Sequence, residues 1–338
     1  MMIMNWKNFF WLLVLSLNFA LGQEDFYASQ TRFMQKTNPS YLGMNNLNKI
    51  GLLYNSLSVG GQNSGMDNKY LFGAFSFDQN KFSLGFDVNS LKIISNDLTI
   101  NIFKFTYVYK VQVTNKTYFL PAITLGIGSK QVNKEGFIFE DQLNVTTGFI
   151  NTETIDPLGE FIDNVNYLDL GASLILHNQN YIFGLSLKHL NRPNTSLNKE
   201  KEYSMPVSIS LQGGYEFDVN PYEQNFLPRY SFLFTYASIT RFEENLYLNL
   251  IEEIRMGEFS VSFNQKLSNV EKFNLNNLGF SAGLSLENFD LGLGYNFPVR
   301  SLAKIHSPSI FEIIVTFDFS RFRRNQRGYH KHLQTDNY

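Results

Sequence analysis

The stretch that decides the fold reads, over residues 278–297, LGFSAGLSLENFDLGLGYNF. Large apolar residues alternate there with small or polar ones, and the alternation restarts after the turn at Asn288. Residues 311–319, FEIIVTFDF, repeat the pattern. Because successive side chains of a strand point to opposite faces, each run has one apolar face. Such strands suit a β-sandwich with that face inside, or a membrane β-barrel with that face toward lipid.

The composition favours the membrane interpretation. Charged residues make up 17% of the 338-residue chain, against roughly 25% in soluble domains. Aromatic residues reach 16%, which suits the aromatic girdles of a membrane barrel. The absence of cysteine excludes disulfides and thiolate chemistry. A net charge of −2 and the lack of a basic stripe argue against a nucleic-acid partner.

Residues 1–22 are predicted to form a signal peptide. Lys7 precedes the apolar run 9–17, and the small residues Ala20 and Gly22 stand before Gln23. The alternative is an uncleaved membrane anchor. Since no later stretch has about 18 consecutive apolar residues, the mature chain is not expected to cross a membrane by a helix. Export combined with alternating strands predicts an outer-membrane location.

The remaining chain divides into three segments. Residues 23–48 lack a clear period and turn at Asn38-Pro39, and we expect them as a periplasmic lead-in at or inside the barrel. Residues 49–319 form the predicted barrel, and residues 320–338 form a basic tail expected to hang in the periplasm. The pattern predicts a closed antiparallel barrel of about fourteen strands: 49–58, 69–77, 82–93, 98–113, 117–132, 166–177, 181–190, 203–219, 229–240, 246–256, 258–267, 278–287, 289–297 and 309–319.

The predicted connections differ in length between the two ends. One end has the tight turns 78–81, 114–116, 178–180, 256–257 and 288, with a longer one at 220–228. The other end has the longer loops 59–68, 94–97, 133–165, 191–202, 268–277 and 298–308. Short periplasmic turns and long extracellular loops are typical of outer-membrane barrels, whereas a sandwich has no reason to alternate in this way.

The charged residues inside strands are expected to face the lumen, because a charge on the lipid face is costly. They are Asp87, Lys104, Asp169, Lys188, Glu216, Glu252 and Asp318. We expect them to pair with one another rather than to line a path. The acidic loop 133–165 could enter the lumen, cap it, contact a partner, or remain a solvated loop.

No residue carries a recognisable chemical motif. The five histidines have no metal-ligand spacing, no serine has a nucleophile signature, and no glycine-rich phosphate loop is present. The sequence therefore predicts no catalytic, cofactor-binding or metal-binding residues, and a protein that is not an enzyme.

Several short motifs resemble the PorP/SprF family of type IX secretion outer-membrane proteins. The residues 26–30, FYASQ, and 38–43, NPSYLG, resemble the start of that family, although Ser40 and Leu42 stand where it favours alanine. The motifs 188–193, KHLNRP, 293–297, LGYNF, and the closing strand 311–319 follow in the expected order.

The resemblance implies a non-enzymatic outer-membrane component of type IX secretion. It implies support for the secretion or surface attachment of cargo proteins, with a link to gliding adhesins in some bacteria. The expected partners are outer-membrane lipid, a secreted cargo protein or its C-terminal domain, and periplasmic ring components of the secretion system. A porin or transporter for a small solute is the first alternative, and a barrel enzyme is the second.

Overall fold

The computed structural model describes most of the chain from residue 29 onward. The described residues are 29–46, 48–58, 65–77, 81–94, 97–133, 142, 164–198, 202–223, 226–269, 272–300, 309–320 and 329–335. The predicted signal peptide and nearly all of the loop 133–165 lie outside them, so both remain predictions.

Two short helical elements precede fifteen strands. The helical elements are α2 (Met34–Thr37) and the 3₁₀ segment η1 (Pro39–Asn46), which is interrupted at Met44 and Asn45. The strands are β1 (Lys49–Ser58), β2 (Gly65–Phe77), β3 (Phe82–Ile93), β4 (Leu98–Tyr109), β5 (Val111–Thr114), β6 (Thr117–Val132), β7 (Val165–His177), β8 (Tyr181–Lys188), β9 (Ser208–Asp218), β10 (Ser231–Phe242), β11 (Asn245–Met256), β12 (Phe259–Ser268), β13 (Asn274–Leu286), β14 (Phe289–Pro298) and β15 (Ser309–Asp318).

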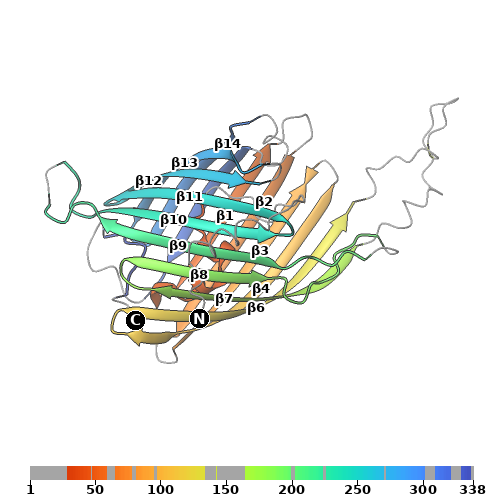
Figure 1. The fold of residues 1–338 in the computed structure, drawn as a ribbon, viewed down its shortest axis with the longest axis horizontal. Coiled ribbons are helices and arrows are strands. Elements are labelled where there is room, and N and C mark those ends of the chain that lie inside the picture. The colour runs from red at the N-terminus through yellow and green to blue at the C-terminus, as the bar shows by residue number, and fades with distance from the viewer. Residues whose placement is uncertain are drawn as a thin grey trace, which may run out of the picture.

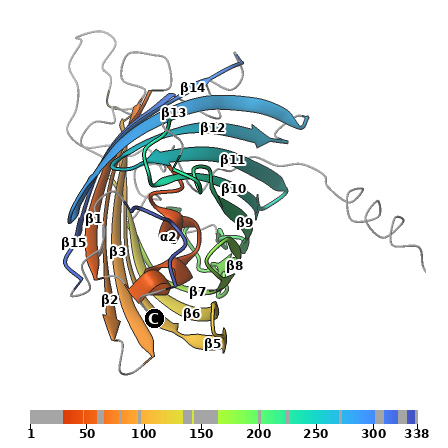
Figure 2. The ribbon, with the colours of Figure 1, turned by 90° about the vertical axis from the view of Figure 1, so that its left-hand side faces the viewer.

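The strands form one closed antiparallel β-barrel (Figures 1 and 2). Neighbours in sequence pair with each other, β1 pairs with β15, and β4 pairs with β6. Strand β5 continues β4 beyond Lys110 and pairs with the same partner, β6, so the ring has fourteen strands. The predicted fold class and strand number are confirmed.

Three strand boundaries differ from the predicted ones by four residues or more. β2 begins at Gly65 because its first residues pair with the end of β1, where Gly65 lies opposite Ser58. β13 likewise begins at Asn274, which lies opposite Ser268 of β12. β9 begins at Ser208 rather than Tyr203, because Pro206 has no N–H to donate to the ladder.

The connections confirm the predicted asymmetry. At the short-turn end, where β1 begins, the connections are 78–81, 115–116, 178–180, 219–230, 257–258 and 287–288. At the long-loop end they are 59–64, 94–97, 133–164, 189–207, 243–244, 269–273 and 299–308. The two-residue turn 243–244 is shorter than its neighbours there. In an outer membrane the short-turn end faces the periplasm.

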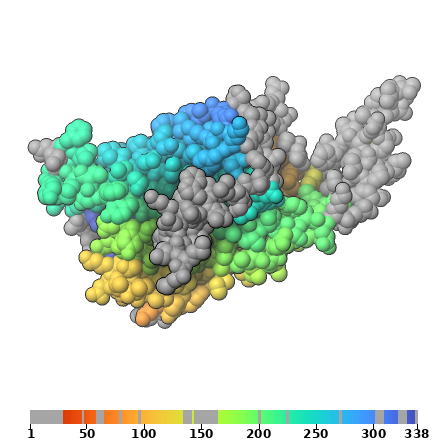
Figure 3. Space-filling view, viewed as in Figure 1, coloured from red at the N-terminus to blue at the C-terminus, as the bar shows by residue number. Residues whose placement is uncertain are grey.

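The outer surface of the barrel is apolar. Outward side chains such as Ile123, Leu168 and Phe259 are 67%, 58% and 62% exposed, and such residues recur along the strands. In Figure 3 the described residues form the outer surface on one side of the barrel, in coloured bands that run along its length. A soluble protein rarely exposes an apolar surface this large, so the surface is the lipid-facing one. Among the described residues, no helix has the length and apolar character needed to cross a membrane.

Candidate functional site inside the barrel

Two segments from opposite ends of the chain lie inside the barrel. Figure 2 looks into the barrel and shows α2 in its interior with the C-terminal segment beside it. Phe33 of the lead-in and Leu333 of the tail are both fully buried. We call residues 29–46 and 329–335 together the plug. The lead-in was expected at or inside the barrel, and the structure places its described part inside.

The tail differs from its prediction. Residues 320–338 were expected to hang in the periplasm as a polar arm, disordered or bound to a partner, but the described residues 329–335 pack inside the barrel. The backbone N–H groups of His332 and Leu333 donate to the two carboxylate oxygens of Glu216 on β9, at 2.8 and 2.9 Å. This carboxylate is fully buried, so the two charge-assisted hydrogen bonds offset the cost of burying it. The signal in the sequence is Leu333, one of the few apolar residues in a mostly polar tail.

Asn38 anchors the lead-in to strands β7, β8 and β9 of the wall. Its side-chain amide donates to Gln212 Oε1 at 2.8 Å and to the carbonyls of Leu174 and Leu185 at 3.1 and 3.3 Å. Its Oδ1 accepts from the N–H of Ser40 at 3.0 Å. A side chain at Gly184 would collide with this amide, so a glycine is needed there. The Asn-Pro-Ser motif is therefore a structural anchor.

The two departures from the family pattern have contacts of their own. Ser40 Oγ lies 2.8 Å from Ser173 Oγ of β7, a hydrogen bond that alanine would lack. Leu42 packs on Gly85 of β3, where an added Cβ would come within 2.4 Å of the Leu42 side chain. Both residues fix the lead-in to the wall.

The first part of the lead-in contacts β12, β13 and β15. The N–H of Ser29 donates to Glu312 Oε2 of β15 at 2.8 Å. Arg32 donates to Ser260 Oγ at 2.5 Å and covers Gly283 of β13. The small residues that alternate with the apolar ones in β13 therefore make room for the plug.

A second buried carboxylate joins the tail to the wall. Glu253 of β11 accepts from Arg255 Nε at 2.9 Å, and its other oxygen lies 3.4 Å from His332 Nε2. Arg255 Nη1 also donates to the carbonyl of His330 at 3.2 Å. The lead-in then meets the tail directly, because Asn45 Nδ2 donates to the carbonyl of His332 at 2.9 Å.

Six of the seven predicted lumen charges point inward. They are Asp87, Lys104, Asp169, Lys188, Glu216 and Asp318. Glu252 is the exception and its prediction was wrong: it lies opposite Phe263, on the side of β12 that exposes Phe259 and Val261. The inward residue is Glu253 instead. With Glu253 inward, the alternating residues Leu246, Leu248 and Leu250 face lipid. Glu253 then also forms its ion pair with Arg255.

The KHLNRP motif closes the wall at the end of β8. His189 Nδ1 and Asp169 Oδ1 lie 2.8 Å apart, with both side chains buried. Asn191 then replaces a strand partner for β7, accepting from the N–H of Leu170 at 3.0 Å and donating to the carbonyl of Leu168 at 2.7 Å. The motif therefore ends one strand and satisfies the exposed edge of the next.

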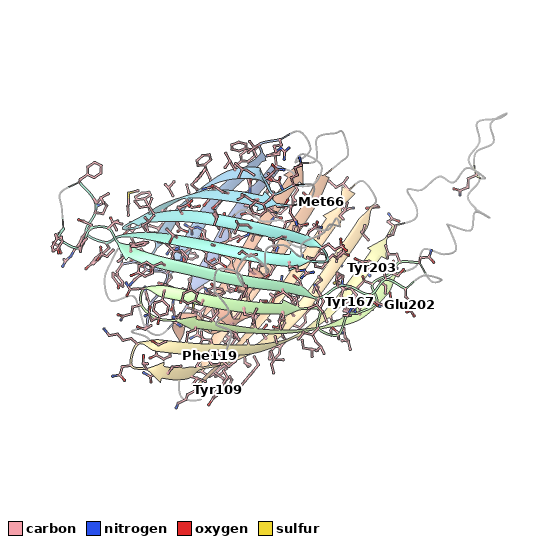
Figure 4. All side chains as sticks on the ribbon, viewed as in Figure 1. Met66, Tyr109, Phe119, Tyr167, Glu202 and Tyr203 are labelled. Carbon is pink, nitrogen blue, oxygen red and sulfur yellow. The ribbon has the colours of Figure 1, made fainter. Side chains whose placement is uncertain are left out.

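A cavity of about 400 Å³ lies between the plug and the long-loop end. Gln35, Lys36 and Pro39 of the plug line the side of the cavity that faces away from the long-loop end. In Figure 4 the wall residues Met66, Tyr167 and Tyr203 gather at this end, and Tyr109 and Phe119 lie at the opposite end. A smaller cavity of about 110 Å³ lies near the short-turn end, between the plug and residues such as Lys49, Asp290 and Asp318.

A hydrogen bond joins two connections at the long-loop end, beside the larger cavity. The Tyr203 hydroxyl donates to Glu243 Oε1 at 2.7 Å, which links the connection 189–207 to the turn 243–244. Burial and the Glu243 carboxylate raise the pKa of Tyr203 to about 12. Within the part of the chain that the structure describes, no three histidine, aspartate or glutamate residues gather as a metal site would require.

A family model described as type IX secretion system membrane protein PorP/SprF matches residues 21–317. The chain belongs to the PorP/SprF family. This membership and the barrel fold make it an outer-membrane component of the type IX secretion system. The resemblance drawn from the short motifs is confirmed, and three of those motifs, NPSYLG, KHLNRP and the closing strand, make the plug and wall contacts described above.

No curated protein matches the chain. Among solved structures, the KdgM porin is 7% identical with a TM-score of 0.35, covering 80% of this chain and 99% of its own. Omp33 of Acinetobacter baumannii is 7% identical with a TM-score of 0.45, covering 81% and 98%. A TodX monoaromatic hydrocarbon channel mutant is 11% identical with a TM-score of 0.49, covering 83% and 91%.

Proposed function

We propose that this PorP/SprF protein is a plugged, non-enzymatic barrel that supports the secretion or surface attachment of partner cargo proteins. The observation that carries the proposal is the plug. Gln212 and Glu216 of β9 and Glu312 of β15 bind the two inserted segments through buried hydrogen bonds. A barrel with this interior suits a platform for other proteins better than an open diffusion pore.

The long-loop end is the proposed site of cargo attachment. In the outer membrane this end faces the exterior, where a secreted protein or its C-terminal domain arrives. Where the host bacterium glides, an adhesin is the expected type of cargo. The acidic loop 133–165 belongs to this end and is part of the proposed contact surface.

The short-turn end is the proposed contact with periplasmic ring components. The start of β1 and the end of β15 lie side by side there: the N–H of Phe319 donates to the carbonyl of Asn48 at 2.9 Å, and the N–H of Asn48 donates to Ser320 Oγ at 2.8 Å. A periplasmic protein bound at this point would contact the residues at the start of β1 and at the end of β15. Residues 1–22 are proposed to direct export and to be removed.

The test is a strain that lacks this protein, complemented with the tagged full-length chain. We expect a subset of type IX cargo to disappear from the cell surface in the deletion strain and to return on complementation. Affinity purification from solubilised outer membranes should recover that cargo and ring components, and another outer-membrane barrel with the same tag is the control. Recovery of neither, with unchanged surface cargo, would reject the proposal.

A further inference from the structure

The barrel wall binds the docked tail, residues 329–335, largely through the backbone of the tail. The N–H groups of His332 and Leu333 donate to the two carboxylate oxygens of Glu216 at 2.8 and 2.9 Å. Arg255 Nη1 donates to the carbonyl of His330 at 3.2 Å. Because every residue except proline offers the same backbone groups, these bonds do not depend on the side chains of the tail. The wall therefore offers a site for a short peptide segment rather than for one fixed sequence.

Three side chains of the tail make the contacts that give this site its selectivity. The ring of Tyr329 meets the ring of Tyr230 edge-on, with 5.3 Å between the ring centres. The ring of His332 lies 4.5 Å from that of Phe234, and Leu333 is fully buried. The site thus selects an aromatic residue that is followed, after two intervening positions, by histidine and leucine.

The site lies at the short-turn end of the lumen. Glu216 is close to the end of β9 and Arg255 is close to the end of β11, and both strands end at the short turns. Lys331 Nζ donates to the carbonyl of Gln179, which belongs to one of these turns. Figure 2 looks into this end and shows the tail beside α2. In an outer membrane, a peptide would therefore reach the site from the periplasm.

The tail is less deeply packed than the lead-in. Among the described residues, the tail adds Leu333 to the buried apolar core. The lead-in adds five residues to it: Phe33, Met34, Tyr41, Leu42 and Met44. Burial of apolar surface is the main favourable term in the association of protein segments. We therefore assign the lead-in as the permanent part of the plug and the tail as the exchangeable part.

Exchange of the tail for another peptide is more favourable than an empty site. The Glu216 carboxylate is fully buried, and both of its oxygens accept hydrogen bonds from the tail. Withdrawal of the tail removes these two donors, and a buried carboxylate that loses its donors is costly. A second peptide that supplies two consecutive N–H groups restores both bonds.

We propose that the short-turn end of the lumen holds a peptide-binding site, which the tail occupies as an internal ligand. The external ligand is a peptide segment of a periplasmic partner with the pattern of Tyr329, His332 and Leu333. Because the tail is tethered to β15, it competes with that segment at a high local concentration. The tail thus regulates access to the site. The proposal does not depend on cargo attachment, and it does not require the partner to be a ring component.

The test is binding of a fluorescently labelled synthetic peptide, residues 327–338, to the purified full-length protein in amphipol, measured by anisotropy. We expect weak binding to the wild-type protein. The full-length variant Leu333→Asp should bind the same peptide about tenfold more tightly, because a charge at this buried position weakens its own tail. Leu333→Ser should act in the same direction with a smaller gain. A tail with a merely structural role would not give tighter binding when it is weakened.

Variants of the wall and of the peptide test where the peptide binds. In the Leu333→Asp protein, adding Glu216→Gln should weaken peptide binding by about tenfold, because a neutral amide accepts hydrogen bonds less strongly than a carboxylate. Glu223→Gln is the matched control, since Glu223 is an exposed carboxylate of the same end that pairs with Arg229 at 2.7 Å. A peptide that itself carries Leu333→Asp should bind about tenfold more weakly than the wild-type peptide.

Three outcomes would overturn the proposal. Equal peptide affinity of the wild-type protein and both tail variants would show that the tail does not compete for the site. Equal binding of the wild-type and the Leu333→Asp peptides would show that the buried leucine is not recognised. An equal loss in Glu223→Gln and Glu216→Gln would show that the effect is not local. Because this assay uses no cargo, a failed secretion experiment leaves its result unchanged, and the reverse also holds.

Discussion

Glu252 places a carboxylate on the lipid-facing side of β11, next to Glu253, which points inward. We expect Glu252→Leu to stabilise the barrel by about 1–2 kcal/mol, because it removes a charge from the apolar belt. Glu253→Leu is the matched control and should destabilise by about 3 kcal/mol, since it leaves Arg255 buried without its carboxylate. The measurement is urea unfolding in phospholipid vesicles. If the two variants exchanged these effects, the assigned faces of β11 would be reversed.

His332 makes the docking of the tail dependent on pH. Burial and the nearby Arg255 guanidinium hold the pKa of His332 below its ordinary value of 6.5, against the opposing effect of Glu253 and Glu216. The undocked tail therefore binds a proton more readily than the docked tail. The contribution of this residue to docking is fully present above its ordinary pKa and is lost as the pH falls through the lowered one.

Hydrogen exchange of residues 329–335 would measure this dependence. We expect lower protection factors, taken relative to the intrinsic exchange rate at each pH, at about pH 5 than at about pH 7.5, with those of the wall strands unchanged. In His332→Gln the side chain no longer titrates, so the difference between the two pH values should shrink. Equal protection of the wild-type tail at both pH values would contradict the assignment.

At the scale of elements, the lead-in is held by a few anchors rather than by a strand ladder. Asn38→Ala removes the amide that donates hydrogen bonds to Gln212 and to two wall carbonyls. We expect this loss to reduce the docking free energy of the lead-in by about 1–3 kcal/mol. The barrel should stay folded, because its strand pairs are untouched. Limited proteolysis should then cleave the lead-in faster, whereas Asn180→Ala, in an exposed turn, should leave cleavage unchanged. Unaltered cleavage of Asn38→Ala would mean that the anchor is dispensable.

At the scale of the whole molecule, the plug decides what the barrel can conduct. We expect little steady conductance of the wild-type protein in planar bilayers, because residues 29–46 and 329–335 occupy the lumen. Deleting residues 23–46 from the mature protein should raise the conductance several-fold, and deleting residues 321–338 should raise it less. Both variants should migrate differently in gel electrophoresis before and after heating, as folded outer-membrane barrels do, and this difference would show that they are folded. A large conductance of the wild-type protein would favour the porin alternative.

The sequence alone determined the barrel wall. In β13, β14 and β15 the period of two assigns each side chain to lipid or lumen, and that property depends only on neighbouring residues. The lengths of the connections were equally local, and they distinguished the two ends. Where two glutamates stand side by side in β11, the period was ambiguous, and the prediction for Glu252 failed.

Only the tertiary structure decided what fills the lumen. Ser29 and Glu312 are 283 residues apart, and the tail reaches Glu216 from 116 residues away. These contacts join single polar groups across the barrel and leave no repeating pattern in the chain. The larger cavity arises in the same way, from side chains on separate strands and from the plug. Contact with lipid requires an apolar side chain at each outward position, and neighbouring residues in the sequence show this. The interior depends instead on which distant polar groups form hydrogen bonds with one another in the closed barrel.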